Sequence, residues 1–290
     1  MKRVAFVTYH KAPRLTSDDA VMLAPLQACD LQVVPAIWDD PNSNWKSFSL
    51  VVLRSCWDYH HKPRAFRDWI KRLEEEKVSV WNPTSIVRWN MEKTYLRELA
   101  ARGVAIPKTE WLEVGDATPL LEIMQRNGFE HAVIKPTISA TAHMTFRTSL
   151  ATAQHDQAGL DEVLRFSGAM IQEFVAEIVT KGEWSLIFFD KKFSHAVLKQ
   201  PRADDFRVQH DFGGTARLAS PPAALIAQAQ RLVGMIASPL LYARVDGVER
   251  EGRLLLIELE LIEPQLFLSF SSAARLRFAE AISGLVQVGG

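Results

Sequence analysis

Two glutamates interrupt an otherwise apolar segment near the C-terminus of the chain. Residues 254–262 read LLLIELELI, and the length and composition of this run predict a buried β-strand. Because side chains alternate across a strand, Glu258 and Glu260 share one face. The opposite face carries the apolar side chains of Ile257, Leu259 and Leu261. Like charges on one face repel each other and resist leaving water, so a positive group has to compensate them.

A hard divalent cation that takes oxygen ligands, Mg²⁺ above all, would supply this compensation. Asp246 lies in the preceding predicted strand and offers a third carboxylate. Two structural alternatives remain open from the residues alone. The segment could be an edge strand with a solvated acidic face, or its glutamates could form ion pairs with Arg244 or Arg253.

The charge balance excludes several classes of partner. Lys+Arg and Asp+Glu both number 34 in 290 residues, and basic residues form no long run, so neither a nucleic acid nor a membrane is an expected partner. No segment is long and apolar enough to span a bilayer, and the first apolar run is too short for a signal peptide. Cys29 and Cys56 form neither a disulfide framework nor a C-x-x-C site, so we expect a cytoplasmic protein. The choice between monomer and homo-oligomer stays open.

The first third of the chain alternates predicted strands with helices. Short apolar runs at Val4–Thr8, Leu31–Ala36 and Leu50–Leu53 predict three strands, with helices expected over 16–28 and 63–77. This alternation is typical of a small three-layer α/β domain with a parallel sheet, which we place at residues 1–85. Beyond it, mixed strands and helices continue to a final helix at 273–286, and no internal repeat is visible.

Polar and aromatic residues follow the third predicted strand. In open α/β sheets ligands bind beyond the carboxyl ends of the strands. We therefore expect a substrate site formed by Arg54, Asp58, Tyr59 and His60. The alternative is a loop that covers the sheet edge, with Arg54 paired to Asp58. Cys56 is expected to be a small buried side chain, since no basic partner is identifiable.

Lys135 ends an apolar strand and is followed by a hydroxyl-rich loop. A buried lysine needs an anion, and phosphate suits its point charge. The loop over 137–145 includes Ser139 and Thr141, whose hydroxyl and backbone N–H groups can approach phosphate oxygens. The loop contains no glycine, so it is neither a P-loop nor a dinucleotide fingerprint.

Two further segments carry polar residues suited to a nucleotide. Gln172 and Glu173 end a predicted strand at a hinge that could hydrogen-bond an adenine edge, and Glu183 could accept from ribose hydroxyls. Arg207 precedes the diglycine at 213–214 and could grip a phosphate or a carboxylate in a bidentate manner. Each of these signals is weak alone, and a surface arginine before a turn is the alternative for Arg207.

The order of these residues resembles that of the ATP-grasp superfamily, over roughly residues 85–285. Its relatives bacterial glutathione synthetase and D-alanine–D-alanine ligase place an α/β domain before two α+β lobes that sandwich ATP. The resemblance implies a small lobe over 86–168, with the phosphate-binding loop, and a C-terminal lobe over 169–290, with the hinge and metal site. It departs from the pattern at Glu260, where those two relatives usually have asparagine, and at the glycine-free loop 137–145.

The resemblance also implies roles for individual residues. ATP would be bound by Lys93, Lys135, Ser139, Thr141, Gln172, Glu173, Val175, Glu183 and Arg207. The catalytic charges would come from Lys135, Arg207 and Arg244. Mg²⁺, with Mn²⁺ as a substitute, would be held by Asp246, Glu258 and Glu260.

A closer resemblance extends over the whole length of the chain. The motifs RSCWDYH at 54–60, WNP at 81–83, RWN at 88–90, SHAV at 194–197, DFRVQ at 205–209 and ELELIEP at 258–264 are similar to those of the ATP-grasp branch that closes the D-cycloserine ring in antibiotic biosynthesis. It implies an ATP-dependent ligase that activates a carboxylate of a small amino-acid-like substrate as an acyl phosphate for attack by nitrogen. Ring closure, two-substrate ligation and a non-catalytic ATP-binding role remain the alternatives. An oxidoreductase is disfavoured, since no G-x-G-x-x-G follows the first strand.

Overall fold

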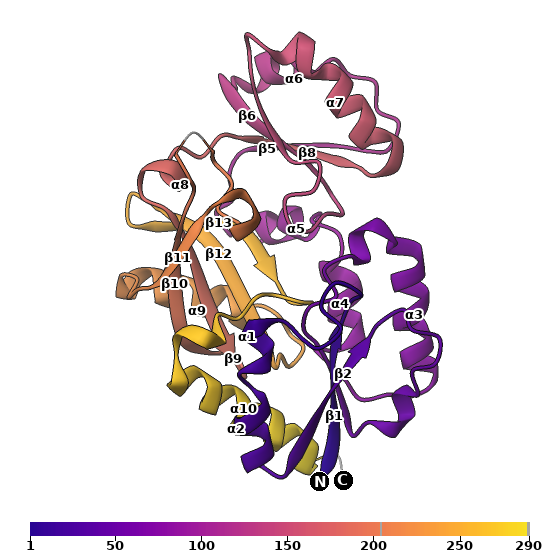
Figure 1. Cartoon of the computed structure of the whole chain (residues 1–290). Coiled ribbons are helices and arrows are strands. Elements are labelled where there is room, and N and C mark those ends of the chain that lie inside the picture. The colour runs from indigo at the N-terminus through magenta and orange to yellow at the C-terminus, as the bar shows by residue number, and fades with distance from the viewer. Residues whose placement is uncertain (204, 289–290) are drawn as a thin grey trace.

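The computed structural model describes residues 1–203 and 205–288 and contains three separate β-sheets. In Figure 1 the N-terminal domain and the C-terminal lobe lie together, and the small lobe extends from them. The start of β1 lies beside the last turns of α10, where Lys2 Nζ donates a hydrogen bond to Val286 O at 2.9 Å. None of the described helices has the length and apolarity that crossing a membrane requires.

The N-terminal domain is built on a parallel sheet of order β2-β1-β3-β4. Its strands are β1 (Lys2–Thr8), β2 (Leu31–Ile37), β3 (Leu50–Leu53) and β4 (Val80–Trp81). Its helices are α1 (Ser17–Ala20), α2 (Leu23–Ala28) and α3 (Pro63–Glu75), with short 3₁₀ turns η1 (Trp45–Ser47) and η2 (Tyr59–His61). The three predicted strands are therefore present, and β4 is an addition that was too short to recognise.

The prediction of one helix over 16–28 is wrong, because the helix is interrupted between Ala20, where α1 ends, and Leu23, where α2 begins. Pro25 has no N–H group, so it cannot take part in a continuous i to i−4 ladder there. Restarting the helix at Leu23 places Pro25 in a first turn, where a missing N–H costs little.

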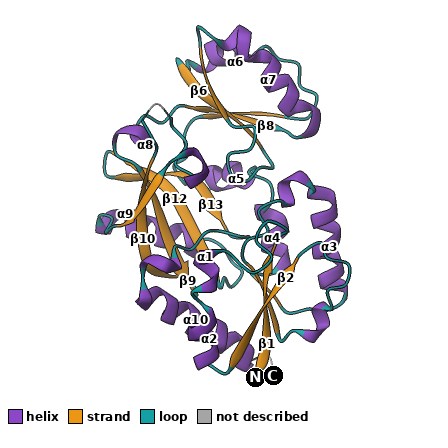
Figure 2. Ribbon diagram, viewed as in Figure 1, coloured by secondary structure: helices purple, strands orange, loops and turns teal. Residues whose placement is uncertain are grey.

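The small lobe has an antiparallel sheet of order β5-β8-β6-β7, with two helices on one face (Figure 2). Helices α4 (Thr84–Asn90) and α5 (Tyr95–Ala101) lead into it. The lobe itself contains β5 (Thr109–Leu112), α6 (Leu120–Asn127), β6 (His131–Pro136), β7 (Phe146–Ser149), α7 (Ala153–Phe166) and β8 (Ala169–Glu173). Because β8 pairs with both β5 and β6, the boundary predicted between 168 and 169 cuts through this sheet and has to move beyond Glu173.

The C-terminal lobe has an antiparallel sheet of order β11-β10-β9-β12-β13. Its strands are β9 (Glu183–Phe189), β10 (Lys192–Gln200), β11 (Thr215–Leu218), β12 (Tyr242–Arg250) and β13 (Arg253–Glu260). Its helical elements are α8 (Glu177–Thr180), η3 (His210–Phe212), α9 (Ala223–Gly234), η4 (Leu268–Phe270) and α10 (Ser272–Val288). The predicted lobe end at 290 lies outside the described residues.

One apolar core joins the N-terminal domain to the C-terminal lobe. Val4 and Phe6 of β1 belong to the same buried cluster as Phe189 of β9, Tyr242 of β12 and Phe278 of α10. The small lobe instead has its own cluster, between its sheet and helices α6 and α7. The N-terminal domain is thus fixed to the acidic strands of the C-terminal lobe.

Candidate functional site

Four charged side chains meet on one face of the β12–β13 hairpin. Arg244 lies directly opposite Glu260, and Asp246 lies directly opposite Glu258. Arg244 and Asp246 are two residues apart on β12, and Glu258 and Glu260 are two residues apart on β13, so all four side chains share a face. The predicted common face of Glu258 and Glu260 agrees with this register, and Asp246 of the preceding strand lies on the same face.

The register is reached through an irregularity. Asp246 pairs with Glu258 but the next residue, Gly247, pairs with Leu256, so Ile257 has no direct partner on β12. Such a bulge inserts one residue and reverses the alternation of side chains beyond it. Ile257 accordingly packs with Val175 and Leu255, whereas Leu259 and Leu261 belong to a different cluster. The predicted common face for Ile257, Leu259 and Leu261 is therefore wrong for Ile257.

Cations compensate the three carboxylates. Lys93 Nζ lies 2.8 Å from Glu258 Oε1, and Arg244 donates to Asp246 Oδ2 at 2.8 Å and to Glu260. The structural alternative of an ion pair with Arg244 is therefore present, and β13 is indeed an edge strand. Within the described residues the three acids do not form a group whose ligand oxygens all lie within 4.8 Å of one another.

The cations of the site do not hold all of its carboxyl groups at their usual pKa values. Burial and the neighbouring Glu258 and Asp246 raise the pKa of Glu260 to about 7, although Arg244 opposes the rise. Burial and Glu260 raise the pKa of Glu263 well above its usual range. Burial would also raise the pKa of Asp246, but Arg244 and Lys199 hold it at about 2. A concentration of oxygen donors that resists full ionisation fits a divalent cation such as Mg²⁺.

Lys135 and Gln172 lie together on the small-lobe sheet. Lys135 Nζ donates to Gln172 Oε1 at 3.0 Å, and Gln172 Nε2 donates to Thr109 Oγ1 at 3.1 Å. Burial lowers the pKa of Lys135, while Glu258 and Glu183 act in the opposite direction. Lys135 therefore faces the carboxylates of the C-terminal lobe across the space between the two sheets. The adenine role of Gln172 stays a prediction, since its side chain is engaged within the sheet.

The loop over 137–145 joins the small lobe to the rest of the site. Lys93 Nζ donates to Ser139 O at 2.7 Å, and the Lys93 backbone donates to Thr137 O at 2.7 Å. Thr141 is exposed and has a left-handed backbone with φ of 52°, as have Ala142 and Met144. Left-handed residues other than glycine are strained. The loop thus adopts a conformation that usually requires glycine without containing any.

The predicted hinge and ribose residues lie on either side of α8. Glu173 forms an ion pair with Arg250 at 3.0 Å, and Val175 is buried between the hinge and β13. Glu183 opens β9 and pairs with Lys199 Nζ at 2.6 Å. Burial raises the pKa of Glu183 despite this partner. Their contacts with a nucleotide remain predictions.

Arg207 lies in a loop that reaches the hinge. Its guanidinium forms an ion pair with Asp205 at 2.9 Å and stacks on the ring of Phe212, with 3.6 Å between Cζ and the ring centroid. The neighbouring Phe206 ring lies 6.3 Å from that of Phe174 at the hinge. Arg207 is thus held by its own loop, and its role toward phosphate stays a prediction.

Arg54 is a buried link between the N-terminal domain and the C-terminal lobe. Only 1% exposed, it donates from Nε to Asp19 Oδ1 at 2.9 Å and from Nη2 to Pro264 O at 3.0 Å. The alternative pairing of Arg54 with Asp58 is wrong, because Asp58 instead accepts from Trp38 Nε1 at 2.7 Å. Among the described residues, Arg54 Nη1 has no partner.

Tyr59 and His60 follow Arg54 at the end of β3. Tyr59 is buried against Phe66, and its hydroxyl lies within the field of Glu263 and Glu258, which raises its pKa together with burial. Cys56 is fully buried, and burial raises the pKa of its thiol, which agrees with the expected inert side chain. Tyr59 therefore lies close enough to the acids of β13 and the segment after it to be affected by their charge, and the substrate role of these residues stays a prediction.

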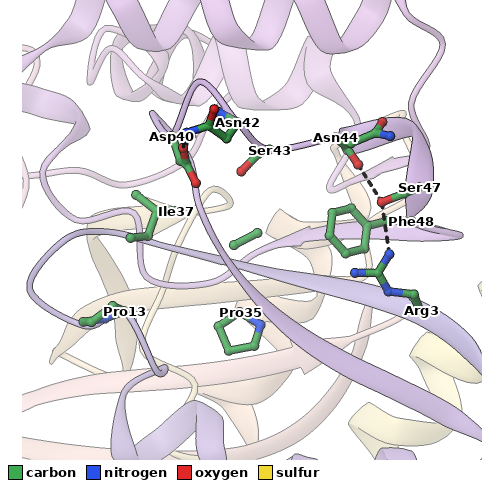
Figure 3. A pocket seen from close by; sticks show the side chains of 11 residues that line it. Arg3, Pro13, Pro35, Ile37, Asp40, Asn42, Ser43, Asn44, Ser47 and Phe48 are labelled. Atoms are coloured by element: carbon green, nitrogen blue, oxygen red, sulfur yellow. Dashed lines mark hydrogen bonds between the residues drawn. The ribbon is translucent and has the colours of Figure 1, made fainter.

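A separate cavity lies at the exposed edge of β2 (Figure 3). It has a volume of about 500 Å³, and its polar wall includes Arg3, whose Nη1 donates to Ser47 Oγ at 3.2 Å. None of the predicted site residues lines it. The concentration of charges on β12 and β13 therefore locates the candidate site better than this hollow does.

Sequence reasoning missed two charged residues of the site and the residues that hold its strand. Lys199 lies between Glu183 and Asp246, just beyond the predicted end of its strand. Glu263 was part of a recognised motif, but no role was assigned to it. Asn82 and Asn90 hydrogen-bond the backbone of β12, β13 and the segment after β13. Their occurrence in the WNP and RWN motifs was the available signal.

Comparison with known proteins gives matches along almost the whole chain. Residues 4–82 match the family model for the N-terminal domain of the D-cycloserine synthetase DcsG. The cycloserine biosynthesis protein DcsG of Streptomyces lavendulae is 31% identical over 261 residues, which is 85% of this chain and 86% of that protein.

Solved structures agree with the sequence matches. The crystal structure of D-cycloserine synthetase DcsG superposes with a TM-score of 0.87 and 26% identity, over 98% of this chain and 99% of that one. D-alanine–D-alanine ligase from Bacillus anthracis, crystallised with ATP, superposes with a TM-score of 0.69 over 100% of this chain and 99% of that one. At 16% identity the second likeness concerns the fold alone.

Proposed function

The chain belongs to the DcsG family of ATP-grasp ligases, and we propose that it closes a ring in an amino-acid-like substrate. The resemblance read from the motifs is confirmed, as are the ATP-grasp fold and an ATP-dependent ligase activity that forms C–N bonds. The observation that carries the site assignment is the set of three carboxylates and Arg244 on one face of β12 and β13.

The cationic side chains have two tasks in this proposal. Lys93 and Lys135 would bind phosphate oxygens of ATP, since both lie beside the carboxylates and one touches the loop over 137–145. Arg244 would stabilise the oxyanion that forms when nitrogen attacks the activated carbonyl. Asp246, Glu258 and Glu260 would hold Mg²⁺, or Mn²⁺ in its place. The bound cation would neutralise phosphate charge during transfer.

The geometry also suggests how water is kept from the acyl phosphate. The loop over 137–145 lies against the N-terminal domain, where Ile138 and Ala140 pack on its core. An acyl phosphate hydrolyses readily, so a closed loop protects it until nitrogen attacks. No protein nucleophile is needed, which is consistent with the inert environment of Cys56.

We propose that the substrate carboxylate and the attacking nitrogen belong to one small molecule, an amino acid whose side-chain oxygen carries nitrogen. Arg54, Asp58, Tyr59 and His60 would border it at the end of β3. The support is the family relationship, since a cycloserine ring joins such a nitrogen to the carboxyl carbon. Both described thiols are free, in keeping with the predicted cytoplasmic location, which remains a prediction.

The metal assignment is tested by Glu258→Gln. This change removes one negative oxygen and the partner of Lys93, so we expect ADP release to fall by about 100-fold or more while the fold persists. Glu251→Gln is the matched control, because Glu251 lies exposed in the turn of the same hairpin. Circular dichroism should be unchanged in both variants. An unaltered rate in Glu258→Gln would refute the metal assignment.

A substrate screen separates ring closure from ligation of two molecules. ADP release is measured with amino acids and their O-substituted derivatives, each added alone and then in pairs. Turnover with one compound alone, and a product that has lost one water, supports cyclisation. Turnover only with pairs would show a two-substrate ligase.

A further inference from the structure

Three histidines from two parts of the fold come together beside the acidic site. His60 and His61 belong to η2 of the N-terminal domain, and His143 belongs to the loop over 137–145 of the small lobe. One ring nitrogen from each can be chosen so that all three lie within 4.8 Å of one another. The ring centroids are 3.9 Å apart for His60 and His61 and 4.7 Å apart for His61 and His143. We call these residues the histidine cluster.

His60 needs a partner that the described protein atoms do not provide. Its side chain is 9% exposed, and among the described residues neither Nδ1 nor Nε2 has a partner at full hydrogen-bond geometry, although the backbone of Trp57 lies close enough to act on the pKa of His60. A buried polar atom without a partner is costly, and native proteins rarely leave both nitrogens of one ring in that state. The buried nitrogen therefore points to a ligand.

The charge state of the cluster favours a cation over an anion. Burial, His61 and His143 lower the pKa of His60 to about 3, and burial also lowers the pKa of His143. A neutral imidazole offers a free lone pair, which a metal ion uses and a phosphate does not. Lys93, whose charge acts on His60, is paired with Glu258 at 2.8 Å, so its charge is compensated.

We propose that the histidine cluster binds a borderline-soft divalent cation such as Zn²⁺, separately from the Mg²⁺ site, and thereby ties the loop over 137–145 to the N-terminal domain. Three imidazoles suit Zn²⁺, Cu²⁺ or Ni²⁺ rather than Mg²⁺, which prefers oxygen. Tetrahedral Zn²⁺ with Zn–N bonds of about 2.0 Å needs nitrogens about 3.4 Å apart. His61 and His143 are exposed and can move that far.

The consequence of binding follows from where the ligands lie. The loop already touches the N-terminal domain through Ile138 and Ala140, and Lys93, which lies between α4 and α5, donates to Ser139 O. A metal bond to His143 adds an anchor at the far, left-handed part of the loop. Opening of the loop then requires breaking a metal–nitrogen bond. Bound Zn²⁺ would therefore slow exchange of nucleotide without occupying the carboxylates.

The experiment uses the full chain without a histidine tag, treated with a chelator and then titrated with Co²⁺ in excess Mg²⁺. Tetrahedral Co²⁺ reports nitrogen ligation through its visible absorption, and Zn²⁺ should displace it. We expect one equivalent to bind. His61→Gln and His143→Gln should each weaken binding by about 100-fold or more. His155→Gln is the matched control, because His155 is exposed on α7.

Two further variants and one readout make the outcome decisive. Glu258→Gln should bind Co²⁺ like the unchanged chain, whereas loss of binding there would place the ion at the carboxylates and overturn the proposal. Equal affinity in His61→Gln, His143→Gln and the unchanged chain would also overturn it. Hydrogen exchange of residues 137–145 should slow with Zn²⁺ in the unchanged chain but not in His143→Gln. If Zn²⁺ does not change the hydrogen exchange of residues 137–145, the proposed link between this loop and the N-terminal domain is refuted.

Discussion

Lys199 is a buried cation held by two carboxylates from different strands. Its Nζ lies 2.6 Å from Glu183 on β9 and 3.2 Å from Asp246 on β12. Burial alone would lower the pKa of Lys199, but Asp246 and Glu183 raise it above its usual value. The lysine therefore stays charged and separates two acids that would otherwise repel each other. It also brings the ribose candidate and the metal candidate into one network.

Replacing Lys199 by methionine tests this network. Glu183 and Asp246 would be left buried without their common cation, and breaking such a pair typically costs about 3–5 kcal/mol of unfolding free energy. Urea unfolding measures the loss. Lys192→Met is the matched control, because Lys192 lies on the same strand but is 83% exposed and pairs only with exposed Asp190. A loss of similar size in both variants would contradict the buried network.

At this scale the sequence predicted the acids better than their partners. Glu258 and Glu260 could be found because they violate the apolar pattern of their own strand. Lys199 could not be found in this way, because it belongs to the site only through its ion pairs with Glu183 and Asp246, which lie 16 and 47 residues away in the chain. Spacing along one strand is visible in a sequence, whereas the pairing of distant strands is not.

The outer edge of β13 is closed by side chains where a neighbouring strand is missing. Leu261 N donates to Asn90 Oδ1 at 2.8 Å, and Asn90 Nδ2 donates to Leu259 O at 2.8 Å. Leu259 N donates to Tyr95 Oη at 3.0 Å. Unpaired edge groups invite slippage or aggregation, so these contacts fix the register that places Glu258 and Glu260.

We expect Asn90→Ala to cost about 1–3 kcal/mol of unfolding free energy for each backbone group left without a partner. The buried N–H of Leu261 and the carbonyl of Leu259 both lose their contact. Thermal or urea unfolding gives the value. Asn42→Ala serves as the control, since Asn42 is exposed and, among the described residues, its side-chain amide hydrogen-bonds only Asp40. An unfolding free energy equal to that of the control would show that β13 holds its register unaided.

Most elements were predictable from local patterns, but not all of their pairings. The strand at Leu50–Leu53 has the predicted bounds, because four consecutive apolar residues end at polar ones. The membership of β8 in the small-lobe sheet was not foreseen, because it depends on contacts with β5 and β6 across α7. The bulge at Ile257 and the left-handed loop residues escaped for a similar reason: tertiary contacts override local preference there.

Across the whole molecule, the N-terminal domain and the C-terminal lobe behave as one body with a shared core. Arg54 joins α1 to the chain after β13, and the hydroxyl oxygen of Tyr242 lies 2.7 Å from both Leu53 O and Ile262 O, to either of which it can donate. Composition gave no sign that the first and last parts of the chain share a core. The small lobe has a cluster of its own, but Met170 of β8 also packs in a cluster with Leu186 of β9 and Val245 of β12.

His195 of β10 lies near α1, α10 and the segment that follows β13. Its protonation makes the stability of this junction depend on pH. The ring of His195 is buried, and its Nε2 lies 2.9 Å from Leu266 O. Arg277 of α10 and Asp18 of α1 lie close enough to affect the pKa of His195. Burial lowers the pKa of His195 below 6.5, although the bond to Leu266 O opposes this. The folded protein therefore keeps the ring neutral at a pH where the unfolded chain binds a proton.

The contribution of His195 to stability consequently falls as the pH drops below about 6.5, because at this residue the unfolded state then takes up more protons than the folded state. One histidine contributes at most about 1.4 kcal/mol per pH unit to this slope. His195→Gln should be less stable near neutral pH but should show a shallower decline of unfolding free energy between pH values of about 7 and 5. Urea unfolding across that range measures the slope. His155→Gln, at an exposed position, should keep the full decline, and an equal slope in both variants would mean that the junction does not resist protonation.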